Sequence, residues 1–335
     1  MTSPRVSVLL PVFDAEDTLD SCLRSVERQA FRDWECVLVD DGSRDASLAM
    51  ARRAAAVDPR IRVVAGPHRG IVAALNVGLA ACRAPLVARM DADDVMHRLR
   101  LALQVEALER HADWAAAGCH VRLFPRDDLT AGMRSYERWL NGLDTPARIL
   151  SDAYVECPIA HPTLMARTAV LREFGYRETE GPEDYDLVLR VLAGGLEIGS
   201  VPRRLLLWRD APGRLSRNSP RYAIDAFTAC KAEHLARGLL AGGSRYVLWG
   251  YGATGRALAA ALERHDKHPD AIVEVHPGRL GNRIRNAPVI APRALAEYRG
   301  LPLVVSVAGA GPRQQIRNAL ASMGYRETHD FIAAA

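Results

Sequence analysis

The first 110 residues alternate between short apolar runs and segments whose apolar positions recur every three or four residues. The runs are strand length and largely apolar, which is typical of parallel strands buried on both faces. They cover residues 6–12, 34–39, 61–64 and 86–91. The segments between them have helical spacing. They cover residues 19–29, 48–57 and 71–81. This β-α-β-α-β-α-β order predicts a right-handed, doubly wound parallel sheet.

The pattern continues less regularly to residue 240. We expect helices at 98–110, 139–151, 183–193 and 222–240. We expect strand-like segments at 114–124, 157–165 and 205–209, with loops at 126–135 and 211–220. At the start of the chain, Asp14 or Asp17 is expected to cap the first helix.

A second unit is predicted after the linker-like residues 241–244. Its expected strands are 245–249, 271–275, 289–290 and 303–307. Its expected helices are 256–264, 292–298 and 313–323. The sequence therefore predicts two domains, residues 1–240 and residues 244–335, the second a smaller Rossmann-like α/β domain.

Composition narrows the class of protein. The chain has 335 residues and a formal net charge of +4, too weak and dispersed for nucleic-acid binding. Its six cysteines have no zinc-site spacing, which favours a reducing cytoplasm. We expect no signal peptide and no membrane span, so any membrane contact would be peripheral, on the cytoplasmic face.

The polar residues that follow the predicted strands carry the candidate chemistry. The central strand ends in Asp91, Asp93 and Asp94, and clustered carboxylates repel one another unless a cation compensates. Oxygen ligands suit Mg²⁺ or Mn²⁺. A solvated acidic turn or a helix cap is the alternative. Because the carboxyl ends of parallel strands share one edge, residues 11–13 and 40–41 are expected beside this cluster.

The chain up to about residue 238 resembles a family 2 glycosyltransferase of the GT-A fold. The resemblance rests on the order and spacing of several short motifs. They are residues 6–11, 39–43, 70–78, 89–94, 161–163, 183–187 with Arg190, and 208–209. It implies a GT-A mixed sheet and inverting transfer of a sugar from a nucleoside diphosphate, UDP by preference, to a hydroxyl of a glycan or lipid-linked acceptor.

The resemblance also implies roles on the donor side. Asp93 would bind the metal, while Asp91 would meet the ribose or share the cation, with Asp94 a weaker third candidate. Asp41 would accept a hydrogen bond from the donor base. Pro11 and Phe13 match positions that wall the base, although Phe13 could equally belong to the core.

Other implied roles concern the acceptor and the diphosphate. Asp184 matches the catalytic base, with an ordinary helix N-terminal acid as the alternative, and Glu183 would contact the acceptor or hold Asp184. His161 matches a histidine near the metal or diphosphate, or is a turn residue before a proline. Arg209 could close over the diphosphate, with Arg214 and Ser216 on the next loop.

Two departures from the family pattern matter. Asp14 stands where asparagine is common after the aromatic of the first motif. Processive synthases carry a Gln-x-x-Arg-Trp motif and membrane helices, whereas here Arg190 is followed by Val191 and no span is expected, which favours a single addition. Two other functions remain as alternatives to a glycosyltransferase. One is a sugar nucleotidyltransferase, a class that usually has a Gly- and Arg/Lys-rich phosphate loop after its first strand, where this chain has the acidic segment 13–17. The other is a nucleotide-binding or assembly protein.

The second domain carries its own motif, Gly250-x-Gly252-x-x-Gly255, between a predicted strand and helix, with Glu274 further on. This pattern can bind NAD(P) or serve close helix–strand packing. Because no hydride-transfer residues are visible, an interaction or structural role is the preferred interpretation. The donor sugar, the acceptor, the linkage and the oligomeric state are not determined by the sequence.

Overall fold

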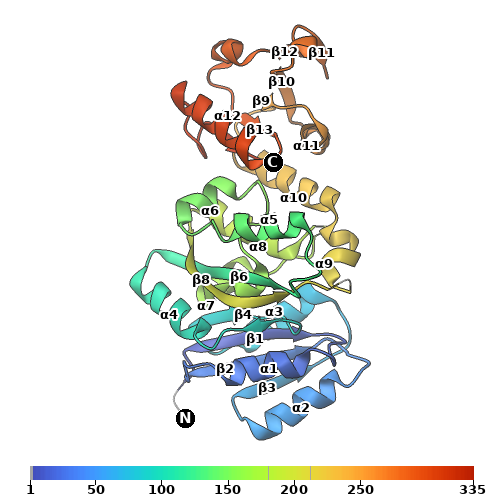
Figure 1. The fold of residues 1–335 in the computed structure, drawn as a ribbon, viewed down its shortest axis with the longest axis vertical. Coiled ribbons are helices and arrows are strands. Elements are labelled where there is room, and N and C mark those ends of the chain that lie inside the picture. Colours follow the sequence, from blue (N-terminus) through green and yellow to red (C-terminus); the bar gives the residue numbers. More distant parts are fainter. Residues whose placement is uncertain (1–2, 180, 212) are drawn as a thin grey trace. The chain divides into compact units, whose positions relative to one another are not determined.

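The structure is a computed structural model that describes residues 3–179, 181–211 and 213–335 (Figure 1). The chain divides into two compact units that alternate along the sequence. The first unit consists of Met1–Ile149, Ile159–Thr179 and Arg190–Arg214. The second consists of Leu150–Pro158, Glu180–Leu189 and Leu215–Ala335.

Among the described residues, the first unit holds an eight-stranded mixed sheet of order β3-β2-β1-β4-β7-β6-β8-β5. Its first four strands in that order are parallel, β7 runs antiparallel to β4 and β6, and β8 is parallel to β6. The strands are β1 (Val6–Val12), β2 (Trp34–Asp40), β3 (Ile61–Ala65), β4 (Leu86–Arg89), β5 (Val95–Met96), β6 (Trp114–Phe124), β7 (Met165–Arg167) and β8 (Glu197–Arg209). The predicted mixed, doubly wound sheet is confirmed.

The apolar runs become strands because every side chain of β1 and β2 is buried. Helices cover the sheet and close its core. They are α1 (Leu19–Glu27), α2 (Ser47–Val57), α3 (Ile71–Ala81), α4 (Arg100–Arg110), α5 (Ala131–Leu140) and α7 (Thr168–Phe174), with the short 3₁₀ helix η1 (His161–Thr163). Two further helices, α6 (Pro146–Asp152) and α8 (Glu183–Ala193), cross from one unit to the other along the chain.

The second unit contains a six-stranded sheet of order β11-β12-β10-β9-β13-β14 among its described residues. All neighbouring pairs are parallel except β11 with β12. The strands are β9 (Arg245–Trp249), β10 (His268–Val273), β11 (Arg283–Ile284), β12 (Ala287–Ile290), β13 (Leu303–Val305) and β14 (Phe331–Ala333). The helices are α9 (Leu215–Asn218), η2 (Pro220–Tyr222), α10 (Ile224–Arg237), α11 (Ala253–Glu263), η3 (Pro277–Arg279), η4 (Pro292–Tyr298) and α12 (Ala310–Ser322).

Several local predictions were wrong. The predicted loop at 126–135 contains the start of α5, because the Thr130 side chain accepts a hydrogen bond from the amide of Met133 and caps the helix. The predicted strand at 157–165 is mostly irregular, and the predicted loop at 211–220 contains α9; residue 212 lies outside the described residues. Neither Asp14 nor Asp17 caps α1, whose N-cap is Thr18 without a side-chain bond.

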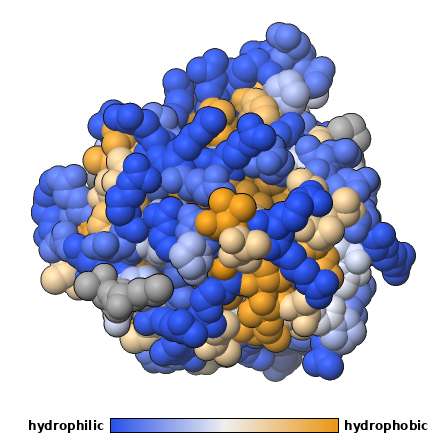
Figure 2. Space-filling model, turned by 90° about the horizontal axis from the view of Figure 1, so that it is seen from below, coloured by the Kyte–Doolittle hydropathy of each residue, from blue (hydrophilic) through white to orange (hydrophobic). Residues whose placement is uncertain are grey.

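None of the helices within the described ranges combines the length and apolar character needed to cross a bilayer. Figure 2, a view of the end that carries α1, α2 and β3 in Figure 1, shows charged and polar side chains over most of that face, with apolar patches between them.

Candidate active site

Three aspartates lie together on the turn after β4. The parallel pairing of β1 and β4 continues to Met90, whose amide donates to the carbonyl of Leu9 at 3.0 Å. Carboxylate oxygens of Asp91, Asp93 and Asp94 then lie within 4.8 Å of one another. An oxygen-only set at the carboxyl edge of a sheet is the kind of site that Mg²⁺ or Mn²⁺ occupies.

The electrostatics of this cluster fit a cation. Burial raises the pKa of Asp93, and the charge of Asp91 raises it further. Burial also raises the pKa of Asp94 well above its usual value, with Asp91 and Asp93 adding to the shift. Asp91 forms an ion pair with the buried guanidinium of Arg89. Among the residues the structure describes, the buried Oδ2 of Asp94 has no hydrogen-bond partner. A divalent cation would relieve this repulsion.

The end of β8 holds the acidic turn in place. The backbone amide of Arg209 donates to Oδ1 of Asp94 at 2.8 Å, and its Nε donates to the carbonyl of Asp93 at 2.8 Å. The Arg209 guanidinium also lies over the ring of Phe124, 4.6 Å from its centroid. Arg214 lies over the ring of Trp208 at 4.8 Å, and its charge lowers the pKa of Asp93 against the larger effect of burial. Both arginines are therefore close to the cluster.

The predicted base-binding residue, Asp41, is buried and organises a loop. Its carboxylate accepts hydrogen bonds from the amides of Arg69 and Gly70 at 2.8 and 2.9 Å, and Nδ1 of His68 lies 2.8 Å from Oδ2. The His68 ring stacks on Phe13 with centroids 4.1 Å apart. Because each carboxylate oxygen has two lone pairs, Asp41 can still accept one more hydrogen bond from a ligand.

The two predicted wall residues differ in exposure. Pro11 is buried within β1, whereas Phe13, just beyond the strand, is 39% exposed. The alternative that Phe13 belongs to the core is therefore wrong. An exposed aromatic ring stacked on an imidazole is a surface on which a nucleobase can stack.

His161 lies in η1 and is buried, and its Nε2 is 3.0 Å from the hydroxyl of Tyr176. Burial lowers the pKa of His161 well below its usual value, and the charge of Arg89 lowers it further, so the ring is neutral at physiological pH. The group of potential ligands found among the described residues consists of the three aspartates. That His161 binds metal stays a prediction.

Glu183 and Asp184 begin α8 in the second unit. The buried Glu183 carboxylate accepts a hydrogen bond from the Tyr222 hydroxyl, with distances of 2.8 and 2.7 Å to its two oxygens. Oδ1 of Asp184 accepts from the amide of Tyr185 at 2.8 Å. The Tyr185 hydroxyl in turn donates to the carbonyl of Ala153 at 2.7 Å, which anchors the first turn of the helix. The roles of Glu183 and Asp184 stay predictions.

Sequence reasoning missed three contacts of the predicted residues: His68 with Asp41, Arg89 with Asp91, and Tyr222 with Glu183. His68 precedes a recognised motif and Arg89 lies within one, which are weak local signals. Tyr222 is 39 positions from Glu183, and nothing in the sequence pattern links the two.

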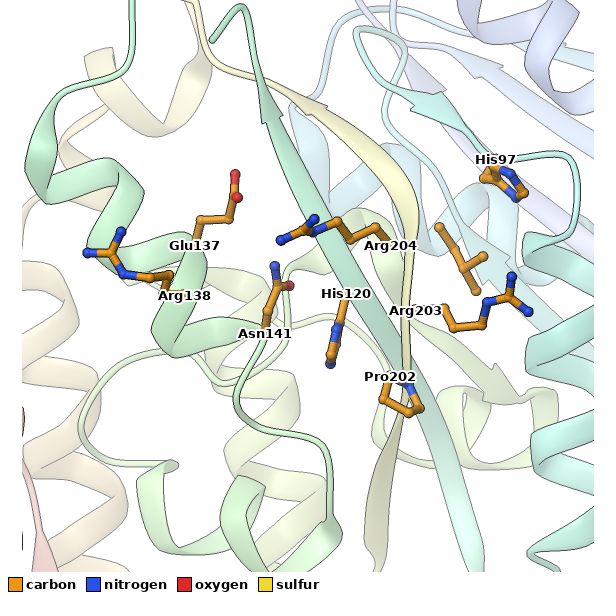
Figure 3. Close-up of a pocket in the computed structure, with 9 residues that line it drawn as sticks. His97, His120, Glu137, Arg138, Asn141, Pro202, Arg203 and Arg204 are labelled. Atoms are coloured by element: carbon orange, nitrogen blue, oxygen red, sulfur yellow. The ribbon is translucent and has the colours of Figure 1, made fainter.

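A separate cavity of about 610 Å³ lies in the first unit between α5 and β8 (Figure 3). In Figure 3, Arg204 extends from β8 toward α5, where Glu137 and Asn141 lie, while Arg203 points to the His97 side. The described lining is His97, His120, Glu137, Arg138, Asn141, Pro202, Arg203, Arg204 and Leu205. None of the predicted site residues is among them, so we do not assign this cavity to the donor.

Comparison with known proteins decides the family. The sequence model of "Glycosyl transferase family 2" matches residues 7–175. The chain belongs to this family. It is 30% identical over 240 residues to the putative glycosyltransferase EpsE of Bacillus subtilis, covering 69% of this chain and 83% of EpsE. It is 31% identical over 204 residues to the amylovoran biosynthesis glycosyltransferase AmsE of Erwinia amylovora, covering 60% of this chain and 74% of AmsE. The protein is therefore a glycosyltransferase.

Other relatives are longer, and the aligned region covers only 26% and 18% of the length of two of them.

Solved structures share the fold of this chain. S. aureus TarS 1–349 in complex with UDP-GlcNAc aligns with a TM-score of 0.55 at 17% identity, over 78% of this chain and 72% of TarS 1–349. The mannosyltransferase PcManGT from Pyrobaculum calidifontis in complex with GDP-Man and Mn²⁺ aligns with a TM-score of 0.52 at 19% identity, over 98% and 83% of the two chains. The predicted GT-A fold is confirmed.

Proposed function

We propose that this glycosyltransferase transfers a sugar with inversion from a nucleoside diphosphate donor, UDP by preference, to a hydroxyl acceptor. The observation that carries the proposal is the cluster of Asp91, Asp93 and Asp94 at the carboxyl end of β4. The fold neighbours solved with UDP-GlcNAc and with GDP-Man and Mn²⁺ support a nucleotide-sugar donor and a divalent cation.

Each residue has a definite task on the donor side. Asp93, with Asp91, would hold the cation, which when bound neutralises the charge that develops on the leaving diphosphate. Asp41 accepts a hydrogen bond from the donor base, and Phe13, stacked on His68, lies against the face of the base. Burial among loop amides keeps the Asp41 carboxylate in one orientation, which favours one base geometry.

Arg209 and Arg214 supply positive charge beside the acidic turn. Their guanidinium groups are held over Phe124 and Trp208, so they need little reorganisation to contact the diphosphate. Inversion needs one base on the acceptor side, and we assign it to Asp184, which takes the proton of the attacking hydroxyl. Glu183 positions the acceptor or Asp184, and Tyr222 holds Glu183.

The named relatives support a proposal for the acceptor class. AmsE is named for the biosynthesis of amylovoran, and we propose a polysaccharide or glycolipid acceptor for this chain as well. A lipid-linked acceptor would bring the enzyme to the cytoplasmic face of a membrane as a peripheral protein.

Asp93→Asn tests the donor site. Transfer from a panel of UDP-, GDP- and dTDP-sugars, followed by mass spectrometry of the products with Mn²⁺ present, should fall about 100-fold or more, because a charged ligand is lost where charge develops. The matched control is Asp113→Asn, an exposed aspartate of the α4–β6 loop, which should transfer normally. Full transfer by Asp93→Asn in the presence of EDTA would contradict the proposal.

A further inference from the structure

The sheet of the second unit reverses its order at one point (Figure 1). From β9 the chain adds β10 and β12 on one side, then β13 and β14 on the other. In open parallel sheets, ligands bind past the carboxyl ends of the strands where the order reverses. Here that point lies between β9 and β13, and the β9–α11 turn borders it.

Packing explains two of the three glycines in that turn. Gly250 has a φ of +96°, and a Cβ there would lie 2.4 Å from Cγ2 of Val307. A Cβ on Gly255 would lie 2.1 Å from the carbonyl oxygen of Gly250, so α11 needs a glycine there to pack against the turn. Both positions would require glycine in a purely structural turn.

Packing does not explain Gly252. Its φ is −73°, which any residue adopts, and a Cβ there would meet no atom within 4 Å. Gly252 is the N-cap of α11, an 11-residue helix whose first amides carry partial positive charge. Open space at this position leaves room for an anionic group to approach the backbone.

A second, independent observation comes from Ser306, which directly follows β13. It is 2% exposed, and its hydroxyl has no hydrogen-bond partner among the described residues. Val304 packs in one cluster with Leu258 of α11, and strand alternation places Ser306 on the same face. The Thr254 hydroxyl donates to the Ser306 carbonyl at 3.4 Å, so Ser306 lies next to the first turn of α11.

The end of β10 adds a carboxylate. Glu274 accepts hydrogen bonds from the amide of Tyr251 and from the Arg279 guanidinium, each at 3.0 Å and both at Oε1. The second oxygen of a carboxylate keeps its own acceptor sites. An acid about 20 residues after the glycine turn is where a nucleotide ribose is bound in such sheets.

We propose that the second unit binds a nucleotide through a diphosphate group, which lies over Gly252 at the start of α11, with a ribose hydroxyl donating to Glu274. Two kinds of molecule share this chemistry, a nucleotide sugar and a dinucleotide such as NAD. The residues of this site all belong to the second unit, and the proposal does not depend on the proposed donor chemistry. It gives the second unit the role of a nucleotide-binding module.

The experiment uses the full chain carrying Asp93→Ala, in EDTA, so that metal-dependent donor binding does not contribute. Isothermal titration with UDP-glucose and, separately, with NAD⁺ measures the remaining site. Gly252→Val fills the open space without backbone strain and should weaken binding about tenfold or more. Ser306→Ala should weaken it a few-fold. The matched control is Gly242→Val, at another open position with ordinary backbone, which should leave affinity unchanged.

The two titrants identify the source of the nucleotide. Binding of either one that is lost in Gly252→Val supports the proposal and assigns the class. The proposal is overturned if neither titrant binds at about 1 mM, the weak end of common substrate affinities, or if Gly252→Val binds like the control. Should Gly252→Val lower the melting temperature, Ser306→Ala decides: unchanged affinity in that variant overturns the proposal.

Discussion

Asp184 shows how much one residue's interpretation depends on its surroundings. At the first turn of α8 it could serve merely as an acid that complements the helix dipole, and Oδ1 does bond a local amide. Asp225 occupies the same position in α10, where it is exposed, and no catalytic role is predicted for it. Comparing substitutions of Asp184 and Asp225 therefore distinguishes an effect on helix stability from an effect on catalysis.

We expect Asp184→Asn to lower kcat about 10²–10⁴-fold, because the hydroxyl loses its proton acceptor, with little change in donor affinity. Asp225→Asn removes an equivalent helix acid and should leave kcat unchanged. Initial rates and thermal melting of both variants check this. Equal loss in the two variants, or loss matched by unfolding, would assign Asp184 to helix stability.

At this scale, sequence reasoning predicted residues but not their partners. The spacing of Asp91 and Asp93 after an apolar strand is a local pattern, and the strand end does bring them together. The Phe13–His68 stack joins residues 55 positions apart through the meeting of two loops. Such a contact depends on the packing of elements, so no local pattern contains it.

Among the elements, β2 is tied to its neighbours by a buried acid. Glu35 accepts hydrogen bonds from Ser7 of β1 and the amide of Arg83 at 2.7 Å each, and from Arg62 of β3 at 2.9 Å. Burial raises the pKa of Glu35, but these donors outweigh it and hold the pKa below its usual value of 4.5. The ionised form therefore stabilises the folded sheet.

We expect Glu35→Gln to reduce the free energy of unfolding by about 1–3 kcal/mol at pH 7. An unfolded chain binds the proton more tightly, so the wild-type advantage is present above pH 4.5 and is lost as the pH falls through the lowered folded pKa. Urea unfolding across pH 3–7 measures it. Glu106→Gln, on the exposed face of α4, is the control and should change stability by less than about 0.5 kcal/mol. A pH-independent deficit would contradict this account.

Two elements have the bounds that the sequence predicts. Helix α3 was predicted from its helical spacing, whereas strand β6 was predicted although its polar and apolar residues alternate poorly. Strand β8 was expected only from residue 205, yet it starts at Glu197. It contains Pro202, Arg203 and Arg204, a sequence that is not typical of a buried strand. The pairing of β8 with β6 shifts register around His120. Pairing across an irregular ladder, rather than propensity, makes this segment a strand.

On the scale of the whole molecule, the two units do not follow the order of the chain. The segment Leu150–Pro158 belongs to the second unit, where Arg317 of α12 contacts it. The Arg317 guanidinium donates to the Ser151 carbonyl at 3.0 Å and to Asp152 at 2.6 Å, and it bonds Glu327 at 2.8 Å. One side chain thus joins parts of the sequence about 165 positions apart.

We expect Arg317→Met to lower the free energy of unfolding by about 3 kcal/mol, because Asp152 and Glu327 are left as partly buried acids without their partner. Differential scanning calorimetry reports the change. Arg326→Met removes an exposed pair with Asp330 and should cost less than about 1 kcal/mol. A smaller loss of stability for Arg317→Met than for Arg326→Met would show that the ion pairs of Arg317 with Asp152 and Glu327 do not stabilise the fold.

The sequence by itself determined the order of strands and helices in the cores, the acidic turn and the membership of a glycosyltransferase family. These properties are written in local periodicity and in short motifs, which need no knowledge of distant residues. Tertiary structure alone decided that Phe13 is exposed and that Arg89 forms an ion pair with Asp91. It also decided that packing requires glycine at positions 250 and 255 but not at position 252. Those properties depend on which atoms surround a residue, and most of these atoms come from elsewhere in the chain.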